Sequence, residues 1–318
     1  MPRVSIVIPV YNGANYLREA IDSALAQTYP NVEVLVVNDG SSDAGATEAI
    51  ARSYGDRIRY LSQSNGGVSS ALNHGIREMS GDFFCWLSHD DRHLPGKTAA
   101  QIAFLNQHQA KIAGCDFEII DGQGKVTGLV RSQLPVIENG LQLLETYVFG
   151  CALMIHRSCF QGRLFNEENR TTQDLEMWLS LIDRDSILWL GEVHAQVRNH
   201  SQQGSFTEIG YAIDKADVFA RVLNSRSASF FDPAATSPAK RALLYDRIAS
   251  NALLRDSIEG AGHALRRAWR EMPSLRNPVL FHILLGPRQW RRFTHARMWT
   301  LSKAAAVQRR ILRLFRET

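Results

Sequence analysis

The chain has 318 residues, of which 45% are hydrophobic and 21% are charged, and its formal net charge is +4. This composition is ordinary for a globular protein, and the length allows one large domain or two medium ones. No apolar stretch approaches the roughly 18 residues that cross a bilayer, and the start lacks the basic and apolar regions of a secretory signal. We therefore expect a cytoplasmic protein in which the four cysteines, without CxxC spacing, are reduced core residues.

The first 90 residues alternate strand-like and helix-like patterns. Near-continuous apolar runs predict buried strands, and apolar residues three and four apart predict the helices between them. The predicted strands are 3–10, 32–37, 58–61 and 82–87, and the predicted helices are one from about Leu17, capped by Asn12 or Asn15, and those at 43–53 and 66–79. This alternation is typical of a parallel α/β sheet.

The pattern changes after residue 110, where shorter strands suggest α+β additions to the same sheet. The predicted strands are 112–120, 126–130, 151–155 and 187–190, and the predicted helices are 138–146, 173–183 and one started by Pro95. From about residue 207 the pattern is almost entirely helical, with a break at 232–240.

Three of the predicted strands end in polar residues. These ends are Pro9-Val10-Tyr11-Asn12, the stretch "NDGSSD" (38–43) and Ser88-His89-Asp90-Asp91. Ligands of parallel sheets bind at the carboxyl ends of strands, so we expect the three ends to converge. The two adjacent aspartates would then stand unburied at the edge of the sheet.

Two like charges about 4 Å apart repel by about 1–4 kcal/mol when partly solvated. A divalent cation bound to both carboxylates replaces this repulsion with attraction. Aspartate oxygens suit Mg²⁺ or Mn²⁺, so Asp90 and Asp91 are a candidate metal site. A solvated helix-capping pair is the alternative. Residues 38–43 alone could equally form a turn, and neither GxGxxG nor GxxxxGK[ST] is present.

Taken together, the motifs resemble those of the nucleotide-sugar glycosyltransferases of family 2. The resemblance covers roughly residues 3–200. It rests on the ordered series "VSIVIPVYNGANYLREAIDSALAQTYPNVEVLVVNDGSSD" (4–43), "NGGVSSALNHGI" (65–76), "WLSHDD" (86–91), "GCALMIHRSCF" (150–160) and "TQDLEMWLSL" (172–181). It implies the GT-A fold, a Rossmann-like α/β architecture with a mostly parallel sheet flanked by helices. We expect a glycosyltransferase domain over 1–205, with a nucleotide-binding half (1–110) and an acceptor half (111–205), and then a helical basic C-terminal region (206–318).

The resemblance also implies a role for each matching residue. Nucleotide-sugar contacts would come from Pro9, Val10, Tyr11, Asn12, Asp39, Asn65, Gly66, Asn73 and Asp90, with Asp39 on the base, typically uracil. Asp90 and Asp91 would hold Mg²⁺ or Mn²⁺, with His200 as an additional metal or diphosphate ligand. Asp174 would be the catalytic base, and Trp178 would help to form the acceptor face.

The sequence departs from the family pattern at two positions. Ser88 replaces the usual first acid of the aspartate motif, and Leu72 stands where relatives often carry an arginine. We favour Asp90 as the principal metal ligand and expect His89 to point at solvent. Both departures put the affinity for nucleotide in question.

The activity implied is an inverting, metal-dependent transfer of a sugar from an NDP-sugar, in particular a UDP-sugar. The acceptor would be a glycan or lipid-linked glycan of cell-surface polysaccharide synthesis. A nucleotidyltransferase of the same fold is disfavoured because a Gly-rich, basic phosphate loop is missing after the first strand. A catalytically inactive module that binds nucleotide-sugars or a partner is the alternative that Ser88 prompts.

The end of the chain is strongly basic. Residues 261–318 carry thirteen Lys or Arg and two acidic residues, a net charge of +11, which leaves −7 for the remainder. Basic amphipathic helices of this kind could lie on an anionic membrane surface, making the protein peripheral on its cytoplasmic face. Packing of a helical subdomain on the body or on a partner chain is the alternative. Nucleic acid is not an expected partner, because no recognised motif accompanies the charge.

Overall fold

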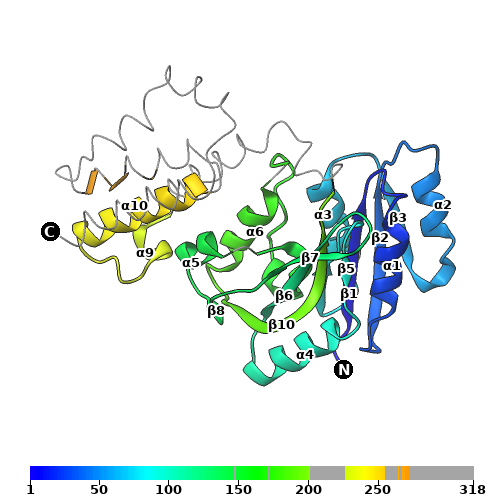
Figure 1. Cartoon of the computed structure of the whole chain (residues 1–318), viewed down its shortest axis with the longest axis horizontal. Helices are drawn as coiled ribbons and strands as arrows, with labels where there is room; N and C mark the ends of the chain where they lie inside the picture. The colour runs from blue at the N-terminus through cyan, green and yellow to red at the C-terminus, as the bar shows by residue number, and fades with distance from the viewer. Residues whose placement is uncertain are drawn as a thin grey trace, which may run out of the picture. The chain divides into compact units, whose positions relative to one another are not determined.

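The computed structural model describes residues 1–200 except Tyr147 and Thr171, residues 226–254, and the single residues Ala264, Arg267, Ala268, Arg270 and Glu271. The chain divides into two compact units, Met1–Tyr211 and Ala212–Thr318 (Figure 1). The predicted boundary at 205/206 lies outside the described residues and stays a prediction.

The first unit is built on one sheet, which has ten strands within the described residues. The strands are β1 (Val4–Val10), β2 (Val32–Asp39), β3 (Arg59–Gln63), β4 (Phe83–Trp86), β5 (Arg92–His93), β6 (Ile112–Ile120), β7 (Val126–Val130), β8 (Val136–Ile137), β9 (Met154–His156) and β10 (Ile187–Arg198). Their order is β3-β2-β1-β4-β9-β6-β10-β5, with β7 beside β6 and β8 beside β10.

Strand direction differs between the two halves of the sheet. Strands β3, β2, β1 and β4 are mutually parallel, as the alternating pattern predicts. In the other half β9 runs antiparallel to β4 and β6, and only β6 and β10 form a parallel pair. The sheet is therefore mixed, with the predicted parallel arrangement concentrated before residue 90.

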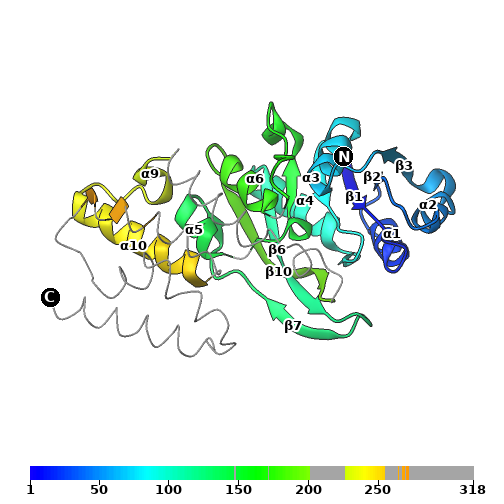
Figure 2. The same ribbon diagram turned by 90° about the horizontal axis from the view of Figure 1, so that it is seen from above.

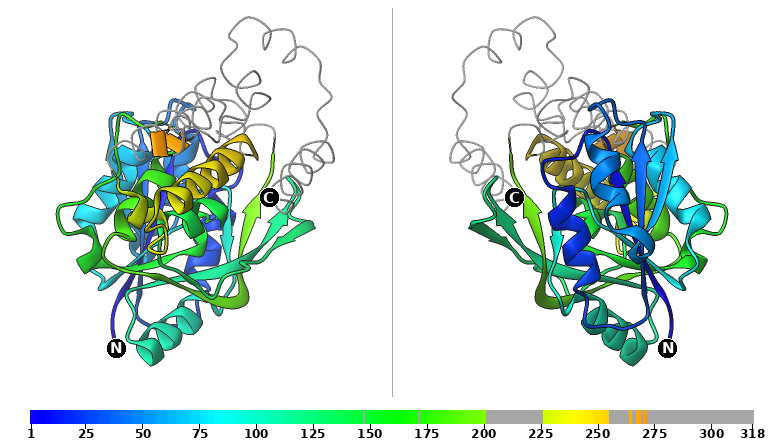
Figure 3. Two further views of the ribbon diagram at one scale, coloured as in Figure 1. Left: turned by 90° about the vertical axis from the view of Figure 1, so that its left-hand side faces the viewer. Right: turned by 90° about the vertical axis from the view of Figure 1, so that its right-hand side faces the viewer.

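Helices cover both faces of the sheet. Those of the first unit are α1 (Leu17–Leu25), α2 (Ala46–Arg52), α3 (Val68–Glu78), α4 (Lys97–His108), α5 (Gly140–Glu145) and α6 (Gln173–Leu181). The second unit, taken by itself, has the described helices α9 (Ala228–Phe231) and α10 (Pro238–Leu254). Figure 2 shows α1, α2 and strands β1–β3 gathered at one end of the first unit, and the right-hand view of Figure 3 faces that end.

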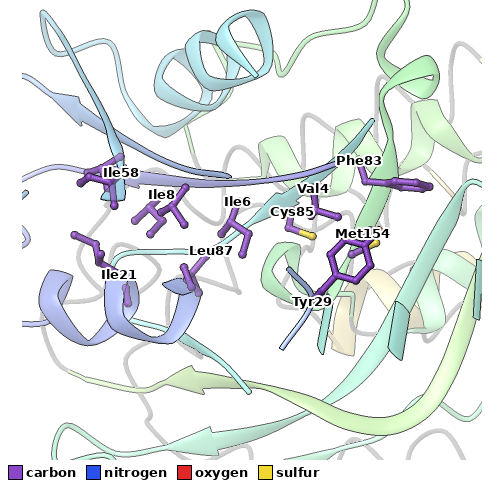
Figure 4. Close-up of a cluster of buried hydrophobic side chains, with 14 of the residues drawn as sticks. Val4, Ile6, Ile8, Ile21, Tyr29, Ile58, Phe83, Cys85, Leu87 and Met154 are labelled. Atoms are coloured by element: carbon purple, nitrogen blue, oxygen red, sulfur yellow. The ribbon is translucent and has the colours of Figure 1, made fainter. Parts of the chain in front are cut away.

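The core explains which helix lies on which face. Alternate residues of β1, such as Ile6 and Ile8, pack with Ile21 of α1 and with Leu87 after β4 (Figure 4). Val7 points the other way and contacts α3 at Gly75. Because side chains alternate along a strand, β1 is buried on both faces, which accounts for its uninterrupted apolar sequence.

Glu33 lies near the start of β2, at the opposite end of this strand from Asp39. It binds several neighbouring groups there. Its Oε1 accepts hydrogen bonds from the Ser5 hydroxyl and from the Ser80 amide at 2.6 Å. Its Oε2 lies 3.4 Å from guanidinium nitrogens of Arg3 and Arg59. Burial alone would raise the pKa of Glu33, but these bonds and the Arg3 charge outweigh it and lower the pKa below its ordinary value.

Several local expectations are corrected by the structure. Helix α1 begins after Tyr16 without a side-chain cap, because Asn12 bonds elsewhere. The strand expected at 187–190 continues through two register shifts to Arg198. The expected strand at 151–155 starts only at Met154, after a 3-10 turn. The short strands β5 and β8 have no periodic signal in the sequence.

The four cysteines are buried and free of disulfides, which confirms their prediction as core residues. Among the helices that the structure describes, none combines the length and the apolar content needed to span a membrane. Nearly all of the basic segment 261–318 lies outside the described residues, so both interpretations of it stay open.

Candidate active site

The loop after β1 is tied to the loop after β2. Asn12 has a backbone in the left-handed region, with φ 50°. Its main-chain amide donates to Ser41 Oγ at 2.9 Å, and its side-chain Oδ1 accepts from the Ser42 main-chain amide at 2.7 Å. Tyr11, between β1 and this tie, is 46% exposed. Pro9 and Val10 are buried in the strand instead. Of these four predicted nucleotide contacts, only Tyr11 and Asn12 therefore present side chains at the surface.

Asp39, the last residue of β2, is buried and organises the loop before α3. Its Oδ1 accepts from Gln63 Nε2 at 2.7 Å and from the Gly66 amide at 2.9 Å. Its Oδ2 accepts from the Gly67 amide at 2.7 Å. A carboxylate offers about four acceptor positions, and these three bonds occupy all but one of them.

The loop before α3 approaches two other segments closely. A Cβ on Gly40 would lie 2.6 Å from the amide nitrogen of Asn65, whose side chain is exposed. Gly67 has φ 87° and ψ 168°, and a Cβ there would lie 2.6 Å from Nη1 of Arg170. Arg170 also donates to the Gly66 carbonyl at 3.3 Å.

Asn73 has a different position from the one expected. It is buried, and its Nδ2 donates to the Phe165 carbonyl and to Glu167 Oε1, both at 2.9 Å. Its Oδ1 accepts from the Phe165 amide at 2.8 Å. Both donors of this side chain thus hold the segment before α6 against α3, rather than facing the ribose or diphosphate.

Asp90 and His200 are brought together from the ends of β4 and β10. The distance from Asp90 Oδ2 to His200 Nε2 is 3.0 Å, although the residues are 110 positions apart in sequence. Both side chains are about 10% exposed or less. The expectation that the aspartates stand unburied is wrong, because the 198–200 segment covers them.

Asp91 has hydrogen-bonding partners of its own. Its Oδ1 accepts from the Arg198 amide at 2.9 Å, and Ser88 and Cys151 donate side-chain hydrogen bonds to its carboxylate. Burial, followed by the neighbouring Asp90 charge, raises the pKa of Asp91 well above its ordinary value. Asp91 is therefore placed as a buried, internally hydrogen-bonded group.

His89 links the aspartate motif to the loop after β1. It is half-buried, and a Cβ on Gly13 would lie 2.4 Å from its ring. Burial lowers the pKa of His89, and the Asp90 charge opposes that shift only in part. The expectation that His89 points at solvent is corrected, because its ring packs beside Gly13.

Asp174 lies in the first turn of α6, half-buried, and its Oδ1 accepts from the Leu175 amide at 2.7 Å. The segment that leads into this helix is held to α3 and to the loop before it by Asn73, by Arg170 and by a 3.5 Å contact from Ser69 Oγ to the Asn169 carbonyl. The segment that leads to the candidate base is therefore hydrogen-bonded both to α3 and to the loop around Gly66.

Trp178 does not form an acceptor face in this structure. Its side chain is 1% exposed and packs edge-to-face on Phe165, with ring centroids 6.0 Å apart. Phe165 in turn packs on Trp86 at 5.9 Å. The helical position that we expected to face the acceptor faces the core instead, because this aromatic column fills the space between α6 and β4.

The 3.0 Å contact between Asp90 and His200 is a hydrogen bond in this structure, and both side chains are of types that bind divalent cations. Oxygen and imidazole ligands suit Mn²⁺, and Mg²⁺ commonly takes one or two protein ligands with phosphate and water. No group of three His, Cys, Asp or Glu side chains is gathered for a metal among the described residues, so a bound ion would need further ligands from the substrate and water.

Sequence patterns did not identify two arginines at this site. Arg170 lies in an irregular segment where nothing in the spacing marks it, and Arg198 is fully buried beside Asp90. Leu72, which stands where relatives often carry an arginine, is buried in α3. A lone arginine gives no periodic signal, so only the tertiary contacts reveal these positions.

Comparison with known proteins defines the class. A family model described as glycosyl transferase family 2 matches residues 5–166, just over half of the chain. A glycosyltransferase of Rickettsia prowazekii is 44% identical over 230 residues, which cover 70% of this chain and 72% of that protein. The chain therefore belongs to glycosyl transferase family 2, as its motifs indicate.

A second relative is much longer than the matched region. The match to a glycosyltransferase of Rickettsia bellii is 48% identical and covers 64% of this chain but only 31% of that protein. The chain thus spans about a third of the length of this relative.

Solved structures share the fold. S. aureus TarS in complex with UDP-GlcNAc superposes with a TM-score of 0.60 at 15% identity, over 87% of this chain and 92% of the other. The mannosyltransferase PcManGT of Pyrobaculum calidifontis, in complex with GDP-Man and Mn²⁺, superposes with a TM-score of 0.54 at 16% identity, over 91% and 83%. At these identities the likeness concerns the fold, and it confirms the predicted GT-A architecture.

Proposed function

We propose that the protein transfers a sugar, with inversion and with a divalent metal, from a UDP-sugar or other NDP-sugar. The acceptor is a glycan or lipid-linked glycan on the cytoplasmic side, in the synthesis of cell-surface polysaccharide. The observation that carries the proposal is the convergence of the Asp39 loop, the Asp90–His200 pair and the segment before Asp174 around the carboxyl ends of β1, β2 and β4.

The nucleotide is bound by the loops after β1 and β2. Tyr11 offers an exposed ring and Asp39 offers its remaining acceptor position to a base N–H, while Asn65 and Gly66 lie beside the ribose. Arg170, next to Gly66 and Gly67, supplies a positive charge near the diphosphate. It replaces the contact that Leu72 cannot make.

Asp90 and His200 would hold Mg²⁺ or Mn²⁺ on the diphosphate. When bound, the ion offsets the negative charge that develops on the departing diphosphate. Keeping Asp91 engaged with the Arg198 amide reduces the repulsion that two ionised carboxylates would cause.

Asp174 acts as general base on the acceptor hydroxyl. As the acceptor oxygen attacks the anomeric carbon, its proton passes to the Asp174 carboxylate. The bond from the anomeric carbon to the diphosphate breaks, and the electron pair leaves with the nucleoside diphosphate. Attack from the face opposite the leaving group inverts the anomeric configuration.

A thermal-shift screen of NDP-sugars, with and without Mn²⁺, selects the donor. Release of nucleoside diphosphate from that donor is then compared between the native protein and Asp174→Asn. General-base catalysis typically contributes about 10²–10⁴-fold, so we expect a loss of that order with unchanged donor affinity. Unchanged turnover in the variant would remove Asp174 from the mechanism.

The basic segment 261–318 would dock the enzyme on anionic lipid. Co-sedimentation of the full chain with vesicles, with and without phosphatidylserine, tests this docking. Binding that requires the anionic lipid and falls with salt is expected. Equal, salt-independent partitioning into both kinds of vesicle would contradict it.

A further inference from the structure

Arg198, at the end of β10, is buried to 1% exposure, and its guanidinium donates to the Asp90 loop, to the turn at 121–122 and to α1. Nε donates to the Asp90 carbonyl at 2.8 Å, and Nη1 donates to the carbonyls of Asp121 and Gly122, both at 3.2 Å. Nη2 donates to Glu19 Oε2 at 2.7 Å. The planar fork of arginine fixes several acceptors at once, which an ammonium group does less well.

The same residue also reaches Asp91 and, through an aromatic ring, His200. Its main-chain amide donates to Asp91 Oδ1 at 2.9 Å. Its guanidinium carbon lies 4.2 Å from the centroid of the Tyr16 ring, and the His200 ring lies 5.1 Å from the same ring. Arg198 thus supports Asp90 directly and His200 through Tyr16.

Glu19 keeps this arginine in place and neutralises it. The carboxylate of Glu19 also pairs with Arg92, whose Nε donates to it at 2.8 Å. Among the described residues, Arg92 is partly exposed and contacts neither the Asp90 carbonyl nor the Tyr16 ring, so the two arginines share a partner but differ in what they support. Replacing Arg92 therefore serves as a control, because it removes a positive partner of Glu19 without touching the contacts of Arg198 to Asp90 and Tyr16.

We propose that Arg198 is the positioning residue that presents Asp90 and His200 to a divalent ion. The inference rests on the metal site of the proposed function and goes beyond it, because Arg198 itself touches neither ion nor substrate. Groups that orient metal ligands typically change metal affinity or activity by about 10–100-fold when they are removed.

The test compares the full-length native protein with Arg198→Met, Arg198→Lys and the control Arg92→Met. Mn²⁺ affinity is measured from the electron paramagnetic resonance signal of free Mn²⁺ in the presence of UDP. UDP affinity is measured by calorimetry with Mn²⁺ and again with chelator. Circular dichroism and cooperative thermal unfolding establish that each variant is folded.

We expect Arg198→Met to weaken Mn²⁺ binding by about 10–100-fold, with an intermediate loss in Arg198→Lys and less than about a twofold change in Arg92→Met. UDP affinity in chelator should stay the same in all four proteins. Lysine keeps the charge and most of the volume, so this variant decides the question if the methionine variant fails to fold.

Native-like Mn²⁺ affinity in a folded Arg198 variant would overturn the inference while leaving the metal site standing. An equal loss of UDP affinity with and without metal would also overturn it, because the role would then be general support of the fold. Failure of the native protein to bind Mn²⁺ with UDP would instead refute the metal site itself, and the positioning role with it.

Discussion

Replacing Gly67 by alanine tests the nucleotide loop most sharply. Gly67 has φ 87° and ψ 168°, a region that is almost restricted to glycine and costs other residues of order 1–3 kcal/mol. The new Cβ would also lie 2.6 Å from Arg170 Nη1, so the arginine must move. If the loop relaxes instead, the 2.7 Å bond from the Gly67 amide to Asp39 is lost, and a bond to a charged group is worth about 1.5–3 kcal/mol.

Whether the strain is kept or the loop relaxes, the free energy of unfolding should fall by about 1–3 kcal/mol. Both cases disturb the loop that would contact nucleotide. Chemical denaturation measures the first effect, and calorimetric titration with UDP measures the second. Gly55→Ala is the matched control, because Gly55 also has a positive φ of 55° but no atom within 4 Å of a new Cβ. It should cost about 1–2 kcal/mol and leave UDP affinity unchanged.

The reasoning is refuted if Gly67→Ala keeps native stability and native UDP affinity. It is also refuted if Gly55→Ala weakens UDP binding as much as Gly67→Ala does, because the effect would then follow overall stability rather than the loop.

Three further predictions concern charge and hydrogen bonding. Arg170→Ala should weaken UDP binding but leave uridine binding unchanged, whereas an equal effect on both ligands would argue against a diphosphate contact. Asn73→Ala should lower the unfolding free energy by about 1–3 kcal/mol, because the Phe165 backbone loses its partner; a stable variant with reduced UDP affinity would point to a ligand contact. Glu33 has a pKa below its ordinary value in the folded state, so its stabilising effect is full above about pH 4.3 and disappears as the pH falls through the folded pKa. The stability difference between the native protein and Glu33→Gln should therefore shrink on acidification, and a difference independent of pH would contradict this assignment.

The parallel half of the fold was accessible from the sequence because β1, β2 and β4 are buried on both faces and form apolar runs. Strand β10 was predicted only as far as residue 190, because Gly191 and the register shifts that follow break the pattern. The missing part carries Arg198 and leads to His200. Periodicity therefore could not place the residues that complete the Asp90 site.

The site itself was predictable in its acidic and loop positions but not in their orientation. Sequence spacing places Asp90 and Asp91 together and cannot show that one faces His200 while the other faces the Arg198 amide. Trp178 likewise lies one helical turn from Asp174, yet the aromatic column through Phe165 draws its side chain into the core. The orientations of Asp90 and Asp91 depend on contacts 110 and 107 positions apart in the sequence.

The most direct test of the account is the Mn²⁺ affinity, in the presence of UDP, of the native protein, Asp90→Asn and Asp91→Asn. The account predicts that Asp90→Asn abolishes measurable Mn²⁺ binding, whereas Asp91→Asn, whose side chain still offers an oxygen to the Arg198 amide, retains it. Native-like binding in Asp90→Asn, or loss of binding only in Asp91→Asn, would contradict it.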